Sequence, residues 1–269
     1  MPASADGEKR AERIVSRDTL ITGVCLIAIV ILAWWWLVRA SPDNVLMSGG
    51  TGAMASMDPG RDVWTVTYLI PAFTMWALMM VAMMLPSAMP MILLYARLSR
   101  QTANSDTNTA VFVLAYLGVW SGFSVLAAVA QAALVSAAIV TGMALKLDSN
   151  ALSGGLLVAV GLYQLSPLKA ACLDQCQSPL SFVMRLWRPG WTGALRLGVR
   201  HGLYCVGCCW ALMLLLFAGG VMNLAWIALL TGLVFIEKVA PQSVPARKII
   251  SAFLLLGGVI IAFAGNIPN

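Results

Sequence analysis

Five of the six cysteines are clustered in one part of the chain, between residues 172 and 209. The only histidine lies among them, and the cluster consists of Cys172, Cys176, His201, Cys205, Cys208 and Cys209. On a helix, His201, Cys205 and Cys208 share one face, with Cys209 at its edge. Thiolates and imidazoles are ligands of soft and borderline metals. The pattern therefore predicts a metal site on a helix, to which Cys172 and Cys176 could add ligands.

Methionine is concentrated in a second segment, between residues 75 and 91. Its candidate ligands are Met79, Met80, Met83 and Met84, because helical spacing aligns Met79 with Met83 and Met80 with Met84. A thioether is soft and uncharged, so it can bind Cu(I) in an apolar setting without burying ligand charge. Copper, as Cu(I), is the first candidate metal, and zinc or iron would also fit the Cys/His ligands. The alternative is that these methionines only pack a helical bundle.

The elements that must position these residues are membrane-spanning helices. Hydrophobic residues make up 60% of the 269 residues and charged residues only 10%, a balance that a soluble domain of this size could not accommodate. The apolar runs are long enough to cross a lipid bilayer as helices, and their continuity excludes the alternating pattern of a barrel. The net charge of +6 is spread between these runs, so we expect the lipid bilayer and no nucleic acid as a partner.

We expect an all-α fold, a polytopic transmembrane helical bundle of about seven spans. The predicted spans are residues 20–38, 64–94, 110–140, 151–166, 201–218, 223–236 and 249–264. A single transmembrane domain, residues 20–266, follows a polar cytoplasmic tail at residues 1–19, which ends without a signal-cleavage pattern. An interfacial segment at about residues 167–200 contains apolar residues beside Arg185 and Arg188, as is typical of a helix lying on the membrane surface.

The distribution of lysine and arginine predicts the orientation. With a cytoplasmic N-terminus, all but three of the 17 basic residues fall on the inner side, and the exceptions are Arg39, Arg61 and Lys146. This bias favours an N-in, C-out protein of the bacterial inner (cytoplasmic) membrane with an odd number of spans. Cys172 and Cys176 would then face the reducing cytoplasm, where a structural disulfide is disfavoured.

The ionisable residues form no recognisable catalytic constellation. Glu237 and Lys238, at the inner end of the sixth predicted span, are expected to be a boundary pair that reaches the headgroups, with gating or charge balance at a metal as the alternative. Asp174 is interpreted in the same way. The chain contains no G-x-x-x-x-G-K-[ST] motif, and one histidine cannot supply a bis-histidine haem. We therefore predict no catalytic residue and favour a protein that is not an enzyme.

Four motifs in a fixed order resemble a known bacterial family. They are WALMMVAMMLPSAMP (Trp76–Pro90), YQLSPLKAACLDQCQSPL (Tyr163–Leu180), GVRHGLYCVGCCWALM (Gly198–Met213) and FIEK (Phe235–Lys238). Together they resemble an integral-membrane family of unknown function that is described as predicted metal-binding and has some members labelled copper chaperone. The resemblance covers about residues 64–238. It implies a metal-linked membrane role for the cysteines and methionines inside the motifs, without identifying the metal or any catalytic residue.

These observations lead to one main hypothesis and two alternatives. The main hypothesis is a membrane-embedded protein that binds Cu(I) and delivers it to a copper enzyme or moves it between leaflets. The first alternative is a thiol-disulfide oxidoreductase that uses Cys205 and Cys208, with Cys172 and Cys176 as exchange partners. The second is a non-catalytic accessory subunit of a larger membrane complex, in which cysteine and methionine only pack.

Overall fold

The computed structural model describes residues 5–41, 62–100, 105–141, 145–239 and 244–264, and this part of the chain is helical apart from one short hairpin. The helices are α1 (Ala5–Ala40), α3 (Val66–Ser99), α4 (Ser105–Ser136), α5 (Asn150–Gln164), α6 (Pro167–Gln177), α7 (Pro179–Leu186), α8 (Gly190–Gly219), α9 (Leu224–Val239) and α10 (Val244–Ala264). Strands β1 (Val140–Thr141) and β2 (Lys146–Leu147) pair antiparallel between α4 and α5. The all-α fold expected from the sequence is confirmed.

Several of the described helices are long and apolar enough to cross a membrane. Four meet this condition alone: α1 over Thr19–Ala40, and the whole of α3, α4 and α8. The helices α5 and α6 meet it only as a pair, bent by 64°. The bend has a local cause, because Pro167 at the start of α6 has no N–H to continue the hydrogen bonding of α5. Ser166 caps α6 by accepting a hydrogen bond from the backbone N–H of Lys169.

Two helices begin earlier than the sequence pattern predicts. α8 begins at Gly190, so the segment expected at the interface consists of α6, α7 and the first turns of α8. Gly190 has a φ of 81°, a backbone conformation that glycine adopts readily and that turns the chain between α7 and α8. α1 begins at Ala5, so most of the polar tail predicted for residues 1–19 is helical and continuous with the first predicted span.

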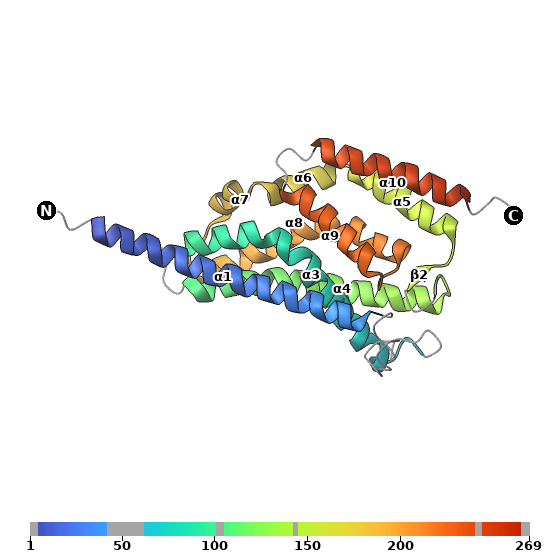
Figure 1. Cartoon of the computed structure of the whole chain (residues 1–269), viewed down its shortest axis with the longest axis horizontal. Helices are drawn as coiled ribbons and strands as arrows, with labels where there is room; N and C mark the ends of the chain where they lie inside the picture. The colour runs from blue at the N-terminus through green and yellow to red at the C-terminus, as the bar shows by residue number, and fades with distance from the viewer. Residues whose placement is uncertain (1–4, 42–61, 101–104, 142–144, 240–243, 265–269) are drawn as a thin grey trace.

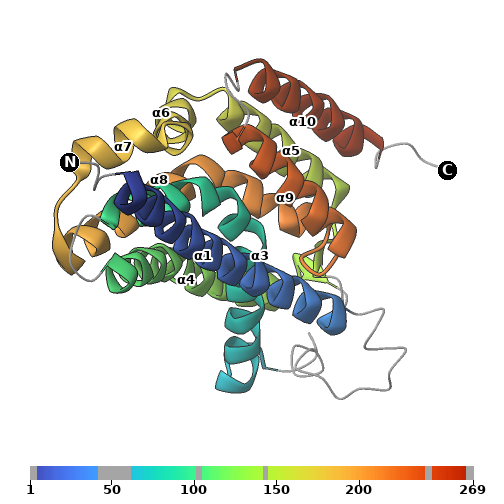
Figure 2. The same cartoon turned by 60° about the vertical axis from the view of Figure 1, so that its left-hand side comes forward.

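Helix α4 packs against both α3 and α8 in the middle of the bundle (Figure 1). α1 lies along α3 on one side, whereas α5 and α10 lie side by side on the other (Figures 1 and 2). α9 contacts both α3 and α8, and α6 packs on α8 and α9. This arrangement brings the methionine-rich helix α3 and the cysteine-rich helix α8 to the same interior.

Glycine allows two pairs of helices to approach closely. A Cβ on Gly198 of α8 would lie 2.4 Å from the carbonyl oxygen of Phe112 in α4. A Cβ on Gly154 of α5 would lie 2.5 Å from the carbonyl oxygen of Gly258 in α10. Small residues that permit such contacts are typical of helix packing in membranes, where apolar surface alone gives no preference for protein over lipid. The first contact holds α8 against α4 close to the buried cysteines.

We predict that Gly198→Leu destabilises the protein, because a leucine side chain would have to displace the backbone of α4. Overpacking of this kind costs about 1–3 kcal/mol, and the measurement is the thermal unfolding midpoint in detergent. Gly122→Leu is the matched control, because nothing lies within 4 Å of a Cβ at Gly122. Equal midpoints for the two variants would contradict the proposed role of Gly198 in packing α8 on α4.

Candidate functional site

Four cysteine thiols form a row that runs from α6 into the interior face of α8. Cys208 Sγ lies 3.3 Å from Cys209 Sγ and donates a 3.1 Å hydrogen bond to the backbone carbonyl of Cys205. Cys205 also interacts with Cys209, and Cys176 of α6 interacts with Cys208. The three cysteines of α8 are fully buried, whereas Cys176 is half-buried. We call Cys176, Cys208, Cys209 and Cys205 the thiol row.

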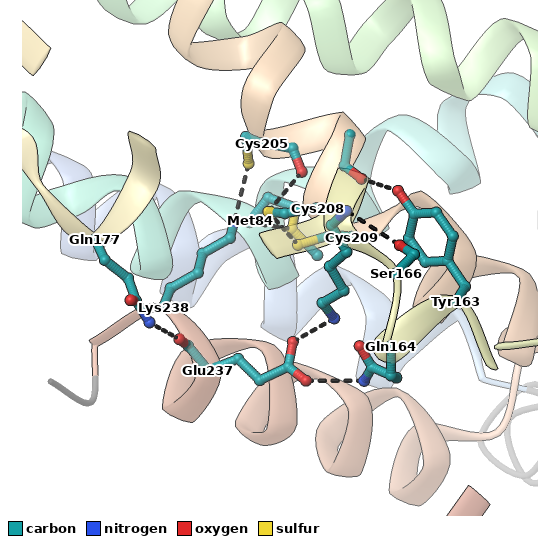
Figure 3. A network of polar contacts seen from close by, with 12 residues as sticks. Met84, Tyr163, Gln164, Ser166, Gln177, Cys205, Cys208, Cys209, Glu237 and Lys238 are labelled. Carbon is teal, nitrogen blue, oxygen red and sulfur yellow. Dashed lines mark hydrogen bonds and ion pairs between the residues drawn. The ribbon is translucent and has the colours of Figure 1, made fainter. Parts of the chain in front are cut away.

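A buried lysine lies at the Cys205 end of the thiol row (Figure 3). Lys238 Nζ lies 2.9 Å from Cys205 Sγ, 3.0 Å from Ser87 Oγ and 3.9 Å from Met84 Sδ. The hydroxyl of Tyr116 lies 3.1 Å from Cys205 Sγ and donates a 3.1 Å hydrogen bond to the carbonyl oxygen of Met84. The site therefore combines an ammonium, a thiol, a thioether and two hydroxyls from α3, α4, α8 and α9.

The environment of Lys238 is unusual for a charged group. Its side chain is 7% exposed, and its hydrogen bonds go to sulfur and hydroxyl groups instead of a carboxylate. A buried ammonium without a counter-charge is costly in an apolar interior. It also attracts negative charge strongly there, because the low dielectric weakens screening. The position of Lys238 therefore favours an anionic sulfur, or an anionic complex formed at that sulfur, beside it.

Glu237 points away from Lys238 and into a second polar network (Figure 3). Its carboxylate accepts a 2.6 Å ion-pair contact from Lys169 Nζ and a 2.8 Å hydrogen bond from the Gln164 amide. Its backbone carbonyl accepts a 2.6 Å hydrogen bond from the side chain of Gln177. The expectation that Glu237 and Lys238 extend to the headgroups is wrong, because both are buried. α6 folds back over this end of α9 and supplies the counter-charge on Lys169.

His201 is a buried imidazole without a polar contact in the part of the chain that the structure describes. It is 3% exposed, and neither ring nitrogen has a hydrogen-bond partner. Its ring stacks on Tyr116, with centroids 5.4 Å apart, and meets the edge of Phe182 of α7 at 5.9 Å. Buried polar atoms are rarely left unpaired. His201 thus offers a nitrogen donor one helical turn from Cys205.

The other predicted ligands lie at different distances from the thiol row. Met79, Met80, Met83 and Met84 are all fully buried in α3, and Met84 is the one that shares partners with Cys205. Cys172 is half-buried on α6, where a Cβ on Gly207 would lie 2.8 Å from its sulfur. Among the described residues, no three His, Cys, Asp or Glu side chains are placed to hold one metal ion. The thiols therefore form an extended row in this conformation, without converging on one point.

Three residues of the site were not singled out from the sequence: Tyr116, Ser87 and Lys169. Each is a polar side chain within or next to an apolar run. Polar groups inside membrane helices need partners in the protein. This requirement could have identified Tyr116 and Ser87 as candidates for a polar site. The partner of Ser87 could not be named, because Lys238 comes from a helix more than a hundred residues later, and Tyr116 contacts Cys205 and Met84 from two other helices.

Comparison with known protein families gives a match over most of the chain. The family PpoB2, described as copper chaperone, matches residues 73–261. The matched region contains the thiol row, Met84, His201 and Lys238. No curated protein and no solved structure matches the chain.

We predict that Glu237→Gln lowers the stability of the protein by about 3–5 kcal/mol, because it leaves the ammonium of Lys169 buried without its counter-charge. The measurement is unfolding in a denaturing detergent, followed by circular dichroism. The double variant Lys169→Met, Glu237→Gln should recover part of the loss, since it removes both charges. Asp174→Asn, an exposed carboxylate on the same α6, is the control. A loss as large in this control would argue against a specific role of the ion pair.

Proposed function

Because the chain belongs to the copper chaperone family, we propose that it binds Cu(I) inside the membrane at the Cys205 end of the thiol row. The proposed donors are the sulfurs of Cys205 and Cys209, with Met84 as a weaker third ligand. The family supports a role in copper handling. The observation that carries the more specific proposal is the buried contact of 2.9 Å between Lys238 Nζ and Cys205 Sγ.

Charge balance is the physical reason for this assignment. Cu(I) bound by two thiolates forms a complex with one net negative charge. Such an anion is costly to bury in an apolar interior unless a cation lies beside it. Lys238 supplies that cation, whereas Glu237 is already neutralised by Lys169. We therefore assign Lys238 the role of counter-ion to the copper-thiolate complex.

The donor set also favours copper over zinc or iron. Structural zinc sites use four nitrogen or sulfur ligands in a tetrahedron, and the described residues present no convergent group of three from His, Cys, Asp and Glu. Cu(I) is softer and accepts thiolates and thioethers at lower coordination number. The sulfur of Met84, which shares Lys238 with Cys205, is a donor that zinc disfavours. His201 is available as a further ligand if the helices adjust.

The thiol row suggests a path for the ion. Cys176 is its most accessible member, whereas Cys208, Cys209 and Cys205 are fully buried. Cu(I) would pass along the row by ligand exchange, each step forming one sulfur–copper bond as another breaks, with no change in oxidation state. Delivery would end at a copper enzyme or another protein of the membrane.

For the membrane arrangement we propose seven spans with the N-terminus in the cytoplasm of a bacterium. The helices α1, α3, α4, α5, α8, α9 and α10 would make up the seven, with α6 and α7 at the membrane surface. The exposed side chains of α10 support this, since Phe253, Leu256 and Ile260 present an apolar surface suited to lipid. We propose that the protein lies in the bacterial inner (cytoplasmic) membrane.

The contacts of Cys205 and Cys208 favour metal handling over thiol-disulfide exchange. Cys205 Sγ contacts Lys238 and Tyr116, whereas Cys208 Sγ contacts Cys209 and the carbonyl oxygen of Cys205. A cysteine pair that cycles between thiol and disulfide must bring its two sulfurs to face each other. Here Cys208 Sγ contacts the sulfur of Cys209, and its contact with Cys205 is to the backbone carbonyl oxygen.

We predict that the variant Cys205→Ser, Cys209→Ser binds Cu(I) at least about 100-fold more weakly than the parent protein, because even indirect partners of a metal site contribute 10–100-fold. The measurement is anaerobic competition with a chromogenic Cu(I) chelator on the reduced, purified protein. Cys25→Ser is the matched control, since Cys25 is an exposed thiol on α1. Unchanged affinity in the double variant would contradict the proposed site.

We predict that Lys238→Leu weakens Cu(I) binding by about 10–100-fold, the range typical of residues that support a metal site indirectly. Leucine removes the positive charge and adds no metal donor, so the copper-thiolate anion would lose its counter-ion. Lys238→Arg should retain more affinity, because it keeps the charge. The same competition assay provides the measurement. Tighter binding by Lys238→Leu would show that the ammonium competes with copper instead of balancing its complex.

A further inference from the structure

A small cavity lined by arginines lies between the end of α7 and the first turns of α8. Its volume is about 100 Å³, and its lining includes the guanidinium-bearing residues Arg185, Arg188, Arg196 and Arg200. The remaining lining residues are apolar, namely Leu186, Trp187 and Leu197, so the lining contains no acidic side chain. This cavity is separate from the thiol row.

The chain around the cavity is built to bring these arginines together. Gly190, with its φ of 81°, turns the chain after Arg188, and a Cβ on Gly193 would lie 2.0 Å from the carbonyl oxygen of Arg188. The connection therefore packs tightly against the first turn of α8. Arg196 and Arg200 are one helical turn apart and line the cavity from α8. Arg185 is held on α7 by a hydrogen bond to the side chain of Gln175.

Four arginines that line one small space concentrate positive charge there, and this charge attracts an anion. Guanidinium groups bind phosphate oxygens through paired, charge-assisted hydrogen bonds, which makes arginine suited to this ligand. A cavity of about 100 Å³ can hold a group of the size of one phosphate. The chemistry of the lining therefore selects a phosphate group as the ligand.

The surroundings of the cavity indicate a lipid as the source of this phosphate. Large apolar side chains beside it are exposed, including Met184 at 65% and Trp191 at 61%. Tryptophan is enriched at the headgroup level of membranes, and arginine clusters at the cytoplasmic surface attract anionic lipids. We propose that this cavity binds the phosphate group of an anionic phospholipid and so fixes α7 and the start of α8 at the membrane surface.

The test is lipid retention by the full chain in nanodiscs of phosphatidylcholine that contain a minor share of phosphatidylglycerol. Native mass spectrometry counts the phosphatidylglycerol that is retained through detergent extraction. Three proteins are compared: the parent, the double variant Arg196→Gln/Arg200→Gln, and the control double variant Arg39→Gln/Arg97→Gln. The control removes the same charge from α1 and α3, outside the cavity lining. We expect about tenfold lower retention in the first variant, since each basic residue near an anionic surface contributes on the order of several-fold, and parental retention in the control.

Two further measurements complete the test. The double variant Arg196→Lys/Arg200→Lys preserves charge. It should retain an intermediate amount of phosphatidylglycerol, because lysine cannot form paired hydrogen bonds with a phosphate. Inorganic phosphate, added during extraction, should not displace the lipid. Equal loss in the control variant would overturn the proposal in favour of diffuse charge attraction. Displacement by inorganic phosphate would overturn it in favour of a free anion. Lipid retention and lipid displacement are both measured by counting phosphatidylglycerol, so the test is independent of copper binding.

Discussion

Among the residues that the structure describes, the charged side chains of Lys169, Glu237 and Lys238 are buried in an apolar bundle, and their need for partners constrains how the helices can be arranged. Glu237 and Lys238 are adjacent in α9, yet their side chains contact different helices. Glu237 binds residues of α5 and α6, whereas Lys238 reaches α3 and α8. A buried charge that loses its partners destabilises the fold strongly. α9 therefore ties the bent pair α5 and α6 to the helices that carry the candidate metal donors.

The sequence predicted the helical fold well because long apolar runs leave the backbone no alternative to helices in lipid. It predicted helix ends less well, since these depend on individual residues. The turn at Gly190 and the restart at Pro167 fix where α8 and α6 begin. The close packing at Gly198 could not be foreseen either, because an apolar helix gives no indication of which of its faces will meet α4. The number of spans stays a prediction.

The candidate site was predictable in part. Cysteine clustering and helical spacing identified Cys205, Cys208 and Cys209, and the structure buries all three. The methionine stripe contained Met84 but gave no means of choosing it among its neighbours. Lys238 was misinterpreted, because a lysine at the end of an apolar run normally extends to the headgroups. Here α6 folds back against α9, and the end of the helix lies inside the protein. Only the tertiary structure reveals this.

The separation of the two charge networks bears on which ion the proposed site would accept. Glu237 is committed to Lys169, so cysteine sulfur is the anionic donor left to offset a metal at Cys205. Two thiolates, one ammonium and a monovalent ion sum to zero net charge. The same groups around a divalent ion leave one positive charge uncompensated, and burying that charge is costly. Charge balance and the softness of sulfur thus favour the same ion, Cu(I), by two independent arguments. In the proposed site, the lysine would select by charge and the sulfur donors would select by softness.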